Sequence, residues 1–173
     1  MNIQSNLELS IAKKMEQLIE LGASAKDLIT LFPQQFSDNP LSAKNKSQRI
    51  YKDLCPATLK SKPGRSVLFH NLAKSKKHKK LISNFSKYLS VYLDSVNKNV
   101  DLTDVFIKTY KAWLSTNNTD EMNFQQAYAI FRHIVAAKSN PYDREIFKKC
   151  TSCSTHYLSL KMIVKKDGCP YCS

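Results

Sequence analysis

Residues 150–172 read CTSCSTHYLSLKMIVKKDGCPYC, and the four cysteines of this stretch decide how the end of the chain folds. Cys150 and Cys153 form one C-x2-C pair, Cys169 and Cys172 form a second, and fifteen residues separate the pairs. Each pair can turn two thiolates toward one ion, so the two pairs together complete a tetrahedral shell of sulfur ligands. A shell without an open position is typical of a structural zinc rather than a catalytic one. The stretch therefore predicts one structural zinc ion per chain.

The residues around these cysteines predict a small module, residues 144–173, that depends on the ion. The segment His156 to Val164 alternates in polarity, which is typical of a strand. A module this short holds too little apolar surface for a core of its own, so zinc would supply its folding free energy, on the order of 10–16 kcal/mol. Reduced thiols without metal, or disulfide-prone pairs, are the alternative interpretation. Cys55 lies outside the set and is expected to act as a small buried hydrophobe.

Upstream of this module, apolar spacing predicts a helical body over residues 1–143. Apolar residues recur at helical spacing in six segments, which Gly, Pro and Asn residues separate. Ser42 is expected to cap the third helix, and the lysines of residues 74–80 are expected to precede the fourth. The fold class is therefore mainly α: a helical bundle with a helix-turn-helix-like N-terminal part and a small four-cysteine zinc-ribbon-like module. The expected helices cover residues 7–21, 24–32, 42–55, 81–96, 101–116 and 124–140.

Positive charge is concentrated in one part of the sequence. The chain has 173 residues with 27 Lys and Arg against 14 Asp and Glu, a formal net charge of +13. Residues 44–80, called the basic strip below, hold twelve Lys and Arg and one acid, whereas residues 81–143 carry equal numbers of both signs. A surplus of this kind does not help folding and indicates an acidic partner: nucleic acid, an anionic membrane or an acidic protein.

The basic strip and the end of the chain supply candidate nucleic-acid contacts. Lysines suit phosphates, whereas Arg49 and Arg65 suit base edges, because a guanidinium can bind guanine through two hydrogen bonds. For any single lysine a solvated surface is the simpler interpretation, and only the clustering favours DNA. The candidate contacts are Lys44, Lys46, Arg49, Lys52, Lys62, Arg65, Lys74, Lys76, Lys77, Lys79, Lys80, Lys165 and Lys166.

Other features bear on location and on catalysis. No uncharged apolar stretch approaches the roughly 18 residues needed to cross a bilayer, and Glu8, Glu16 and Glu20 argue against a signal peptide. The sequence therefore predicts a cytoplasmic protein without a membrane partner. It shows no paired carboxylates in a metal-binding arrangement, no Gly-rich phosphate loop and no His cluster around an open site, so no enzymatic activity is expected.

Three stretches, in order along the chain, resemble the family of the flagellar master-regulator subunit FlhC. The first is LIELGA at residues 18–23 with LSAKNKSQRIYKDL at residues 41–54. The second is the turn KPG at residues 62–64 with Phe69 shortly after it. The third is VFIKTYKAWL at residues 105–114 with AYAIFRHIV at residues 127–135, followed by the four cysteines. The resemblance covers nearly the whole chain.

The resemblance implies a transcriptional activator. Members of this family are helical, bind one zinc ion through four cysteines, and act in a hetero-oligomer with the small helical subunit FlhD, which binds promoter DNA and recruits RNA polymerase. The loop at residues 33–40 and the lysine run at 74–80 depart from flagellar members, and relatives on conjugative elements switch on transfer genes. Flagellar and conjugative-transfer genes are therefore both possible targets. A basic zinc-ribbon protein that binds RNA or takes part in translation is the alternative.

Overall fold

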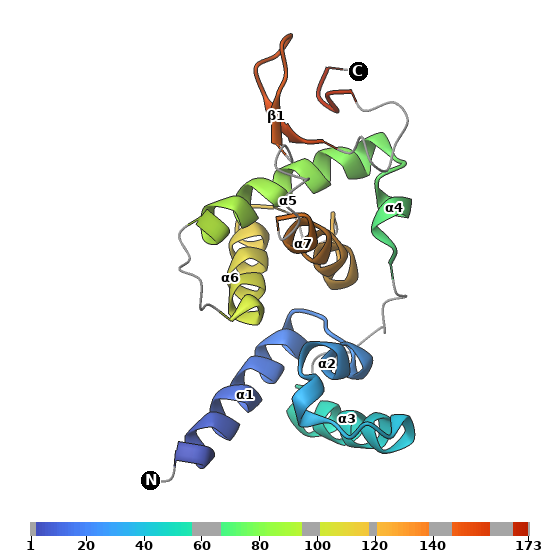
Figure 1. The fold of residues 1–173 in the computed structure, drawn as a ribbon, viewed down its shortest axis with the longest axis vertical. Coiled ribbons are helices and arrows are strands. Elements are labelled where there is room, and N and C mark those ends of the chain that lie inside the picture. Colours follow the sequence, from blue (N-terminus) through green and yellow to red (C-terminus); the bar gives the residue numbers. More distant parts are fainter. Residues whose placement is uncertain are drawn as a thin grey trace. The chain divides into compact units, whose positions relative to one another are not determined.

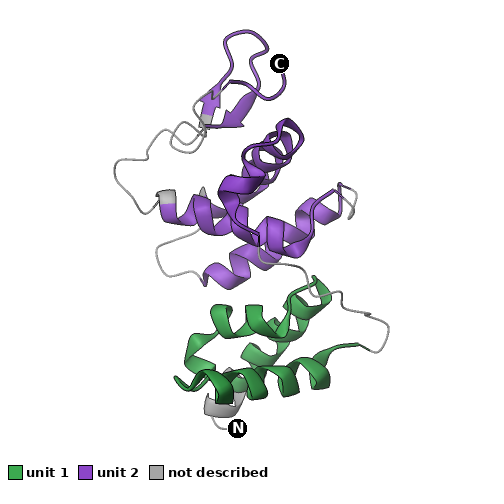
Figure 2. Ribbon diagram, turned by 90° about the vertical axis from the view of Figure 1, so that its right-hand side faces the viewer, with its two compact units in different colours: residues 1–64 green, residues 65–173 purple. Residues whose placement is uncertain are grey.

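The computed structural model describes residues 3–56, 67–94, 101–117, 121–138, 147–159 and 168–172, and most of them are helical (Figure 1). The mainly helical class predicted from the sequence is confirmed. The chain divides into two compact units, residues 1–64 and residues 65–173 (Figure 2). The expected domain boundary at residue 143 falls within residues 139–146, outside the described residues, and it stays a prediction.

The first unit is built around α3, which packs against both α1 and α2. Gly22 has a φ of 100° and ends α1 in the left-handed conformation that glycine adopts without strain. Leu18, Ile19 and Leu28 are among its most deeply buried side chains. The elements of this unit are α1 (Ile3–Glu20), α2 (Ala25–Leu31), the 3-10 helix η1 (Pro33–Gln35) and α3 (Pro40–Leu54).

Polar caps fix where α2 and α3 begin. The amide of Ser24 donates to the Asp27 carboxylate at 2.7 Å and the amide of Asp27 donates back to Ser24 Oγ at 3.4 Å, which is a reciprocal capping box. Asn39 caps α3, because its Oδ1 accepts two first-turn amides at 3.0 and 3.2 Å. The expected cap at Ser42 is wrong. Pro40 follows Asn39 and starts the helix there, since its missing N–H would have no partner at that position.

The second unit is arranged around α5. Helices α6 and α7 pack on one side of α5, and the strands lie on its other side, where β2 contacts it (Figure 1). Strands β1 and β2 pair antiparallel, with Lys149 opposite His156. The elements of this unit are α4 (Phe69–Leu72), α5 (Lys76–Asp94), α6 (Leu102–Leu114), α7 (Phe124–Lys138), β1 (Phe147–Lys149) and β2 (His156–Leu158).

An aromatic cluster fills the core between α5, α6 and α7. Phe106 is fully buried, and its ring centroid lies 5.2 Å from that of Phe131 and 5.4 Å from that of Phe124. The hydroxyl of Tyr110 donates to the carbonyl of Met122 at 3.0 Å, and burial raises the pKa of Tyr110 to about 12. The aromatic side chains of this core therefore pack against one another and are buried rather than exposed on the surface.

The structure differs from the sequence expectation at both ends of this unit. Helix α5 begins at Lys76 rather than at residue 81, so most of the lysine run is helical. The expected strand is confirmed at His156–Leu158, whereas residues 160–167 lie outside the described residues. The short strand β1 has no counterpart in the expectation. Within the described ranges, no helix has the length and apolar character needed to cross a membrane.

Candidate functional site

The first cysteine pair lies in the turn of the β1–β2 hairpin. β1 ends directly before Cys150, and Cys153 lies three residues further on, ahead of β2. Two backbone hydrogen bonds close the turn: the amide of Cys150 donates to the carbonyl of Thr155 at 3.0 Å, and the amide of Ser154 donates to the carbonyl of Cys150 at 2.9 Å. Ser154 has a φ of 57°, in the left-handed region, which lets the chain reverse within these few residues.

The second cysteine pair lies in a separate turn, and the two turns bring all four sulfurs together. The amide of Cys172 donates to the carbonyl of Cys169 at 3.4 Å. The Sγ atoms of Cys150 and Cys172 are 3.5 Å apart, and those of Cys153 and Cys169 are 3.7 Å apart. All four sulfurs lie within 4.8 Å of one another. The clustering that the cysteine spacing predicts is confirmed, and the cluster can hold a metal ion.

The spacing of the sulfurs fits a tetrahedral ion. Bonds of about 2.3 Å from zinc to sulfur place the corners of a regular tetrahedron roughly 3.8 Å apart. The two short sulfur–sulfur distances in the cluster are close to that value. Four cysteine sulfurs are also the ligand set typical of structural zinc. The residues present therefore fit the ion that the sequence predicts.

Hydrogen bonds shift the pKa values of Cys153 and Cys172 in opposite directions. Hydrogen bonds with the hydroxyl and the amide of Thr155 lower the pKa of Cys153 to about 6. Hydrogen bonds with the thiols of Cys153 and Cys150 raise the pKa of Cys172 to about 12. Near neutral pH, Cys153 therefore loses its proton readily, whereas Cys172 keeps its proton. A divalent cation would displace those protons, so metal affinity is expected to rise with pH.

One stripe of α5 holds the four-cysteine segment against the helical body. Lys80, Ser83 and Lys87 follow one another at spacings of three and four residues, which places them on one helix face. The buried Ser83 Oγ accepts the amide of Leu158 at 3.1 Å. The Nζ atoms of Lys80 and Lys87 lie 5.9 and 5.5 Å from the ring centroid of Tyr171, beside the second cysteine pair. These contacts hold the turn of the second cysteine pair on this face of α5.

The candidate nucleic-acid contacts lie in both units. In the first unit, four are exposed on α3: Lys44, Lys46, Arg49 and Lys52. In the second unit they lie at or just before the start of α5, where Lys79 is half-buried and the others, Lys74, Lys76, Lys77 and Lys80, are exposed. Four more fall outside the described residues: Lys62, Arg65, Lys165 and Lys166.

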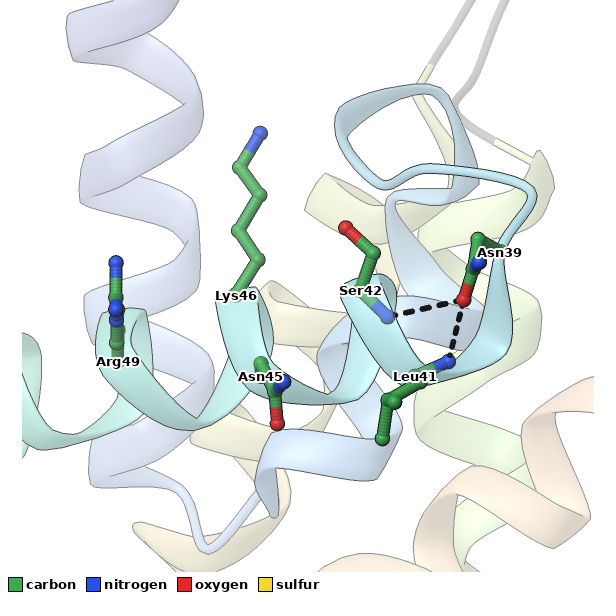
Figure 3. A pocket seen from close by; sticks show the side chains of 6 residues that line it. All are labelled: Asn39, Leu41, Ser42, Asn45, Lys46 and Arg49. Atoms are coloured by element: carbon green, nitrogen blue, oxygen red, sulfur yellow. Dashed lines mark hydrogen bonds between the residues drawn. The ribbon is translucent and has the colours of Figure 1, made fainter.

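Lys46 has two partners within its own unit. Its Nζ donates to the carbonyl of Gln35 at 2.7 Å and lies 5.9 Å from the ring centroid of Phe36. Lys46 therefore braces the segment that leads into α3. Lys46 also borders a hollow of about 540 Å³ on α3, and Figure 3 shows the side chains that line it. Among the described residues, its lining consists of Asn39, Leu41, Ser42, Asn45, Lys46 and Arg49.

Three residues of these surfaces were not found by sequence reasoning. Asn45 is uncharged, so counting charges does not detect it, although it lies one helical turn before Arg49. Lys87 and Tyr171 are separated by most of the second unit, and only the folded chain brings them together. The spacing of Lys80 and Lys87 by seven residues was the one available signal that they share a face.

Comparisons with known proteins found no match: no family model, no curated protein and no solved structure is similar to this chain. The functional conclusion therefore depends on the residues and contacts described above. The four-cysteine cluster and the exposed cations of α3 and α5 are the two features that it has to explain.

Proposed function

We propose that the chain is a DNA-binding subunit of a transcriptional activator, in which a structural zinc ion organises the C-terminal segment. The observation that carries this proposal is the concentration of twelve Lys and Arg in the basic strip. Apart from Lys79, all of the described members of that group are exposed. Cations that neutralise phosphates release counterions from DNA, which gives affinity that falls steeply with salt. The chain acts in the cytoplasm and performs no catalytic step.

Helix α3 is the proposed element that enters the major groove. It packs on both other α-helices of the first unit, as the second helix of a helix-turn-helix does, and it keeps its cations exposed. An α-helix with its side chains is about 10–12 Å across, which suits a major groove about 12 Å wide. Arg49 is placed to bind a guanine edge, and Lys44 and Lys52 are placed to bind phosphates.

The lysines at the start of α5 form the second proposed contact. Lys76 and Lys77 occupy the first turn of α5, where the helix dipole disfavours cations, and no acidic residue of that turn compensates them. Phosphates of a bound duplex would relieve this repulsion. The other proposed contacts to DNA are Lys62, Arg65, Lys74, Lys79, Lys80, Lys165 and Lys166, of which the last two precede the second cysteine pair in the sequence.

The proposed partner is a small helical subunit like FlhD, as the family resemblance implies. Two exposed apolar side chains of the second unit, Val91 on α5 and Leu102 on α6, are consistent with a protein partner. The resulting hetero-oligomer would recruit RNA polymerase to the promoters of flagellar or conjugative-transfer genes. Zinc would act in it only through folding, by fixing the four-cysteine segment on α5.

Genome-wide footprinting of the chain co-expressed with an FlhD-like subunit tests the proposal. We expect discrete protected duplex segments upstream of genes whose transcription depends on the complex. The variant Arg49→Ala should lose this protection, whereas Lys13→Gln, an exposed lysine of α1 outside the basic strip, should keep it. An absence of protected segments, or protection that Arg49→Ala leaves intact, would overturn the proposal.

A further inference from the structure

The exposed face of α3 carries more than its cations. Because a helix turns by about 100° per residue, side chains spaced by three or four residues fall into one stripe. All members of this stripe are exposed, and Ala43 marks the buried side of the helix. The stripe, called the reading stripe below, consists of Leu41, Asn45, Arg49 and Lys52.

Two residues of the reading stripe contribute little to the fold. The side chain of Leu41 is 67% exposed, so its apolar surface is left in water rather than in the core. Asn45 is exposed, and no hydrogen bond to its side chain is found within the described part of the chain. Asparagine is also a poor helix former, so stability alone would favour alanine at such a position. Contact with a bound partner would explain why an apolar side chain and an asparagine occupy these exposed positions.

The chemistry of the reading stripe matches the edges of base pairs. In the major groove, an asparagine amide can bind N6 and N7 of adenine, an arginine can bind O6 and N7 of guanine, and an apolar side chain can contact the methyl group of thymine. From Leu41 to Arg49 the helix rises about 12 Å, which corresponds to roughly three to four base pairs. Lys46 is not part of this stripe, because it is held by Gln35 and Phe36.

We propose that Leu41 and Asn45 are specificity-determining residues, and that the reading stripe recognises a short duplex sequence. Asn45 contacts an adenine, Arg49 contacts a guanine within the same few base pairs, and Leu41 packs on a thymine methyl group. Lys52 contacts a phosphate at the edge of this sequence. The inference rests on the proposed function, since it assigns the sequence-reading residues of the same DNA-binding surface.

Selection from a randomised duplex DNA library tests this inference. The zinc-loaded chain, co-expressed with its FlhD-like subunit, should enrich one short motif, and Asn45→Ala should lose the adenine preference at one position of it, by about 5- to 150-fold. Its dependence on salt should stay unchanged, because asparagine neutralises no phosphate. Arg49→Lys should lose the guanine preference, and Leu41→Ala should weaken the thymine preference.

Two control variants separate base reading from other effects. Asn71→Ala makes the same chemical change at an exposed position of α4, and it should keep the complete motif. Lys44→Gln should keep the motif but reduce the slope of log K against log salt by about 0.9. Thermal melts should show that Asn45→Ala folds as the wild type does, since alanine is the better helix former.

The contradicting outcomes distinguish this inference from the proposed function. Enrichment of the unchanged wild-type motif by Asn45→Ala would overturn the inference and leave the proposed function standing. A wild-type complex that binds the library without selecting a sequence would overturn both the inference and the proposed function, because discrete promoter sites require sequence selection. A wild-type complex that retains no duplex at all would also overturn both.

Discussion

Replacing Ser83 with alanine is expected to loosen the four-cysteine segment from α5 without changing a cysteine. Ser83 is buried in α5, and its Oγ accepts the amide of Leu158, which lies 75 residues further along the chain. The Leu158 side chain is 2% exposed, so water does not readily reach this region. In Ser83→Ala the amide stays buried and loses its acceptor.

The expected cost follows from that lost acceptor. A buried donor without a partner costs about 1–3 kcal/mol, which corresponds to an increase of about 5- to 150-fold in the equilibrium constant for opening. The contacts of Lys80 and Lys87 with the ring of Tyr171 remain in this variant. The segment should therefore open more often while keeping its folded state as the dominant one.

Hydrogen exchange at the Leu158 amide and the rate of zinc transfer to a chelator measure this opening. Both rates should rise in Ser83→Ala. The control is Ser86→Ala, because the hydroxyl of Ser86 donates at 2.6 Å to the carbonyl of Ile82 in its own helix, and its removal leaves no amide unpaired. Equal rates in the two variants would refute the reasoning that Ser83 holds the segment on α5.

Three further predictions concern the metal, the start of α3 and a buried tyrosine. Native mass spectrometry should find one zinc ion per chain, lost in Cys150→Ser and kept in Cys55→Ser, since Cys55 lies outside the cysteine cluster; zinc retained by Cys150→Ser would contradict the assignment. Urea titration should show that Asn39→Ala lowers the free energy of unfolding by about 1 kcal/mol, and equal stability of the variant would exclude the cap. Burial raises the pKa of Tyr110 from 10.0 to about 12, so the folded chain keeps that proton longer than the unfolded chain. The contribution of Tyr110 to the free energy of unfolding is therefore fully present below pH 10. It should fall by about 2–3 kcal/mol as the pH rises to 12. Thermal melts of Tyr110→Phe should show a smaller loss over this range, and an unchanged loss would contradict the buried-tyrosine argument.

The features that the sequence predicts well are those that neighbouring residues decide. The spacing within each C-x2-C pair restricts the ligands to one ion, so the cluster follows from the sequence alone. Apolar residues at helical spacing place the helix interiors. Gly22 marks the end of α1, because the left-handed conformation found there costs glycine nothing.

The features that sequence reasoning misses depend on competition or on distant contacts. Asn39 and Ser42 are both good caps, and Pro40 decides between them by its position. Lysine has a high helix propensity, so α5 extends back to Lys76 without apolar residues to mark the extension. Strand β1 is only three residues long and is defined by its pairing with β2, which no local pattern predicts.

The competition between duplex DNA and structured RNA for the zinc-loaded chain in complex with its FlhD-like subunit tests the central claim most directly. The two probes are a duplex that carries the selected motif and an RNA hairpin with the same number of phosphates, each measured over a range of salt concentrations. We predict tighter binding to the duplex, with a slope of log K against log salt that Lys44→Gln and Lys52→Gln each reduce by about 0.9. Equal or tighter binding of the hairpin, or a slope that neither variant changes, would contradict the account.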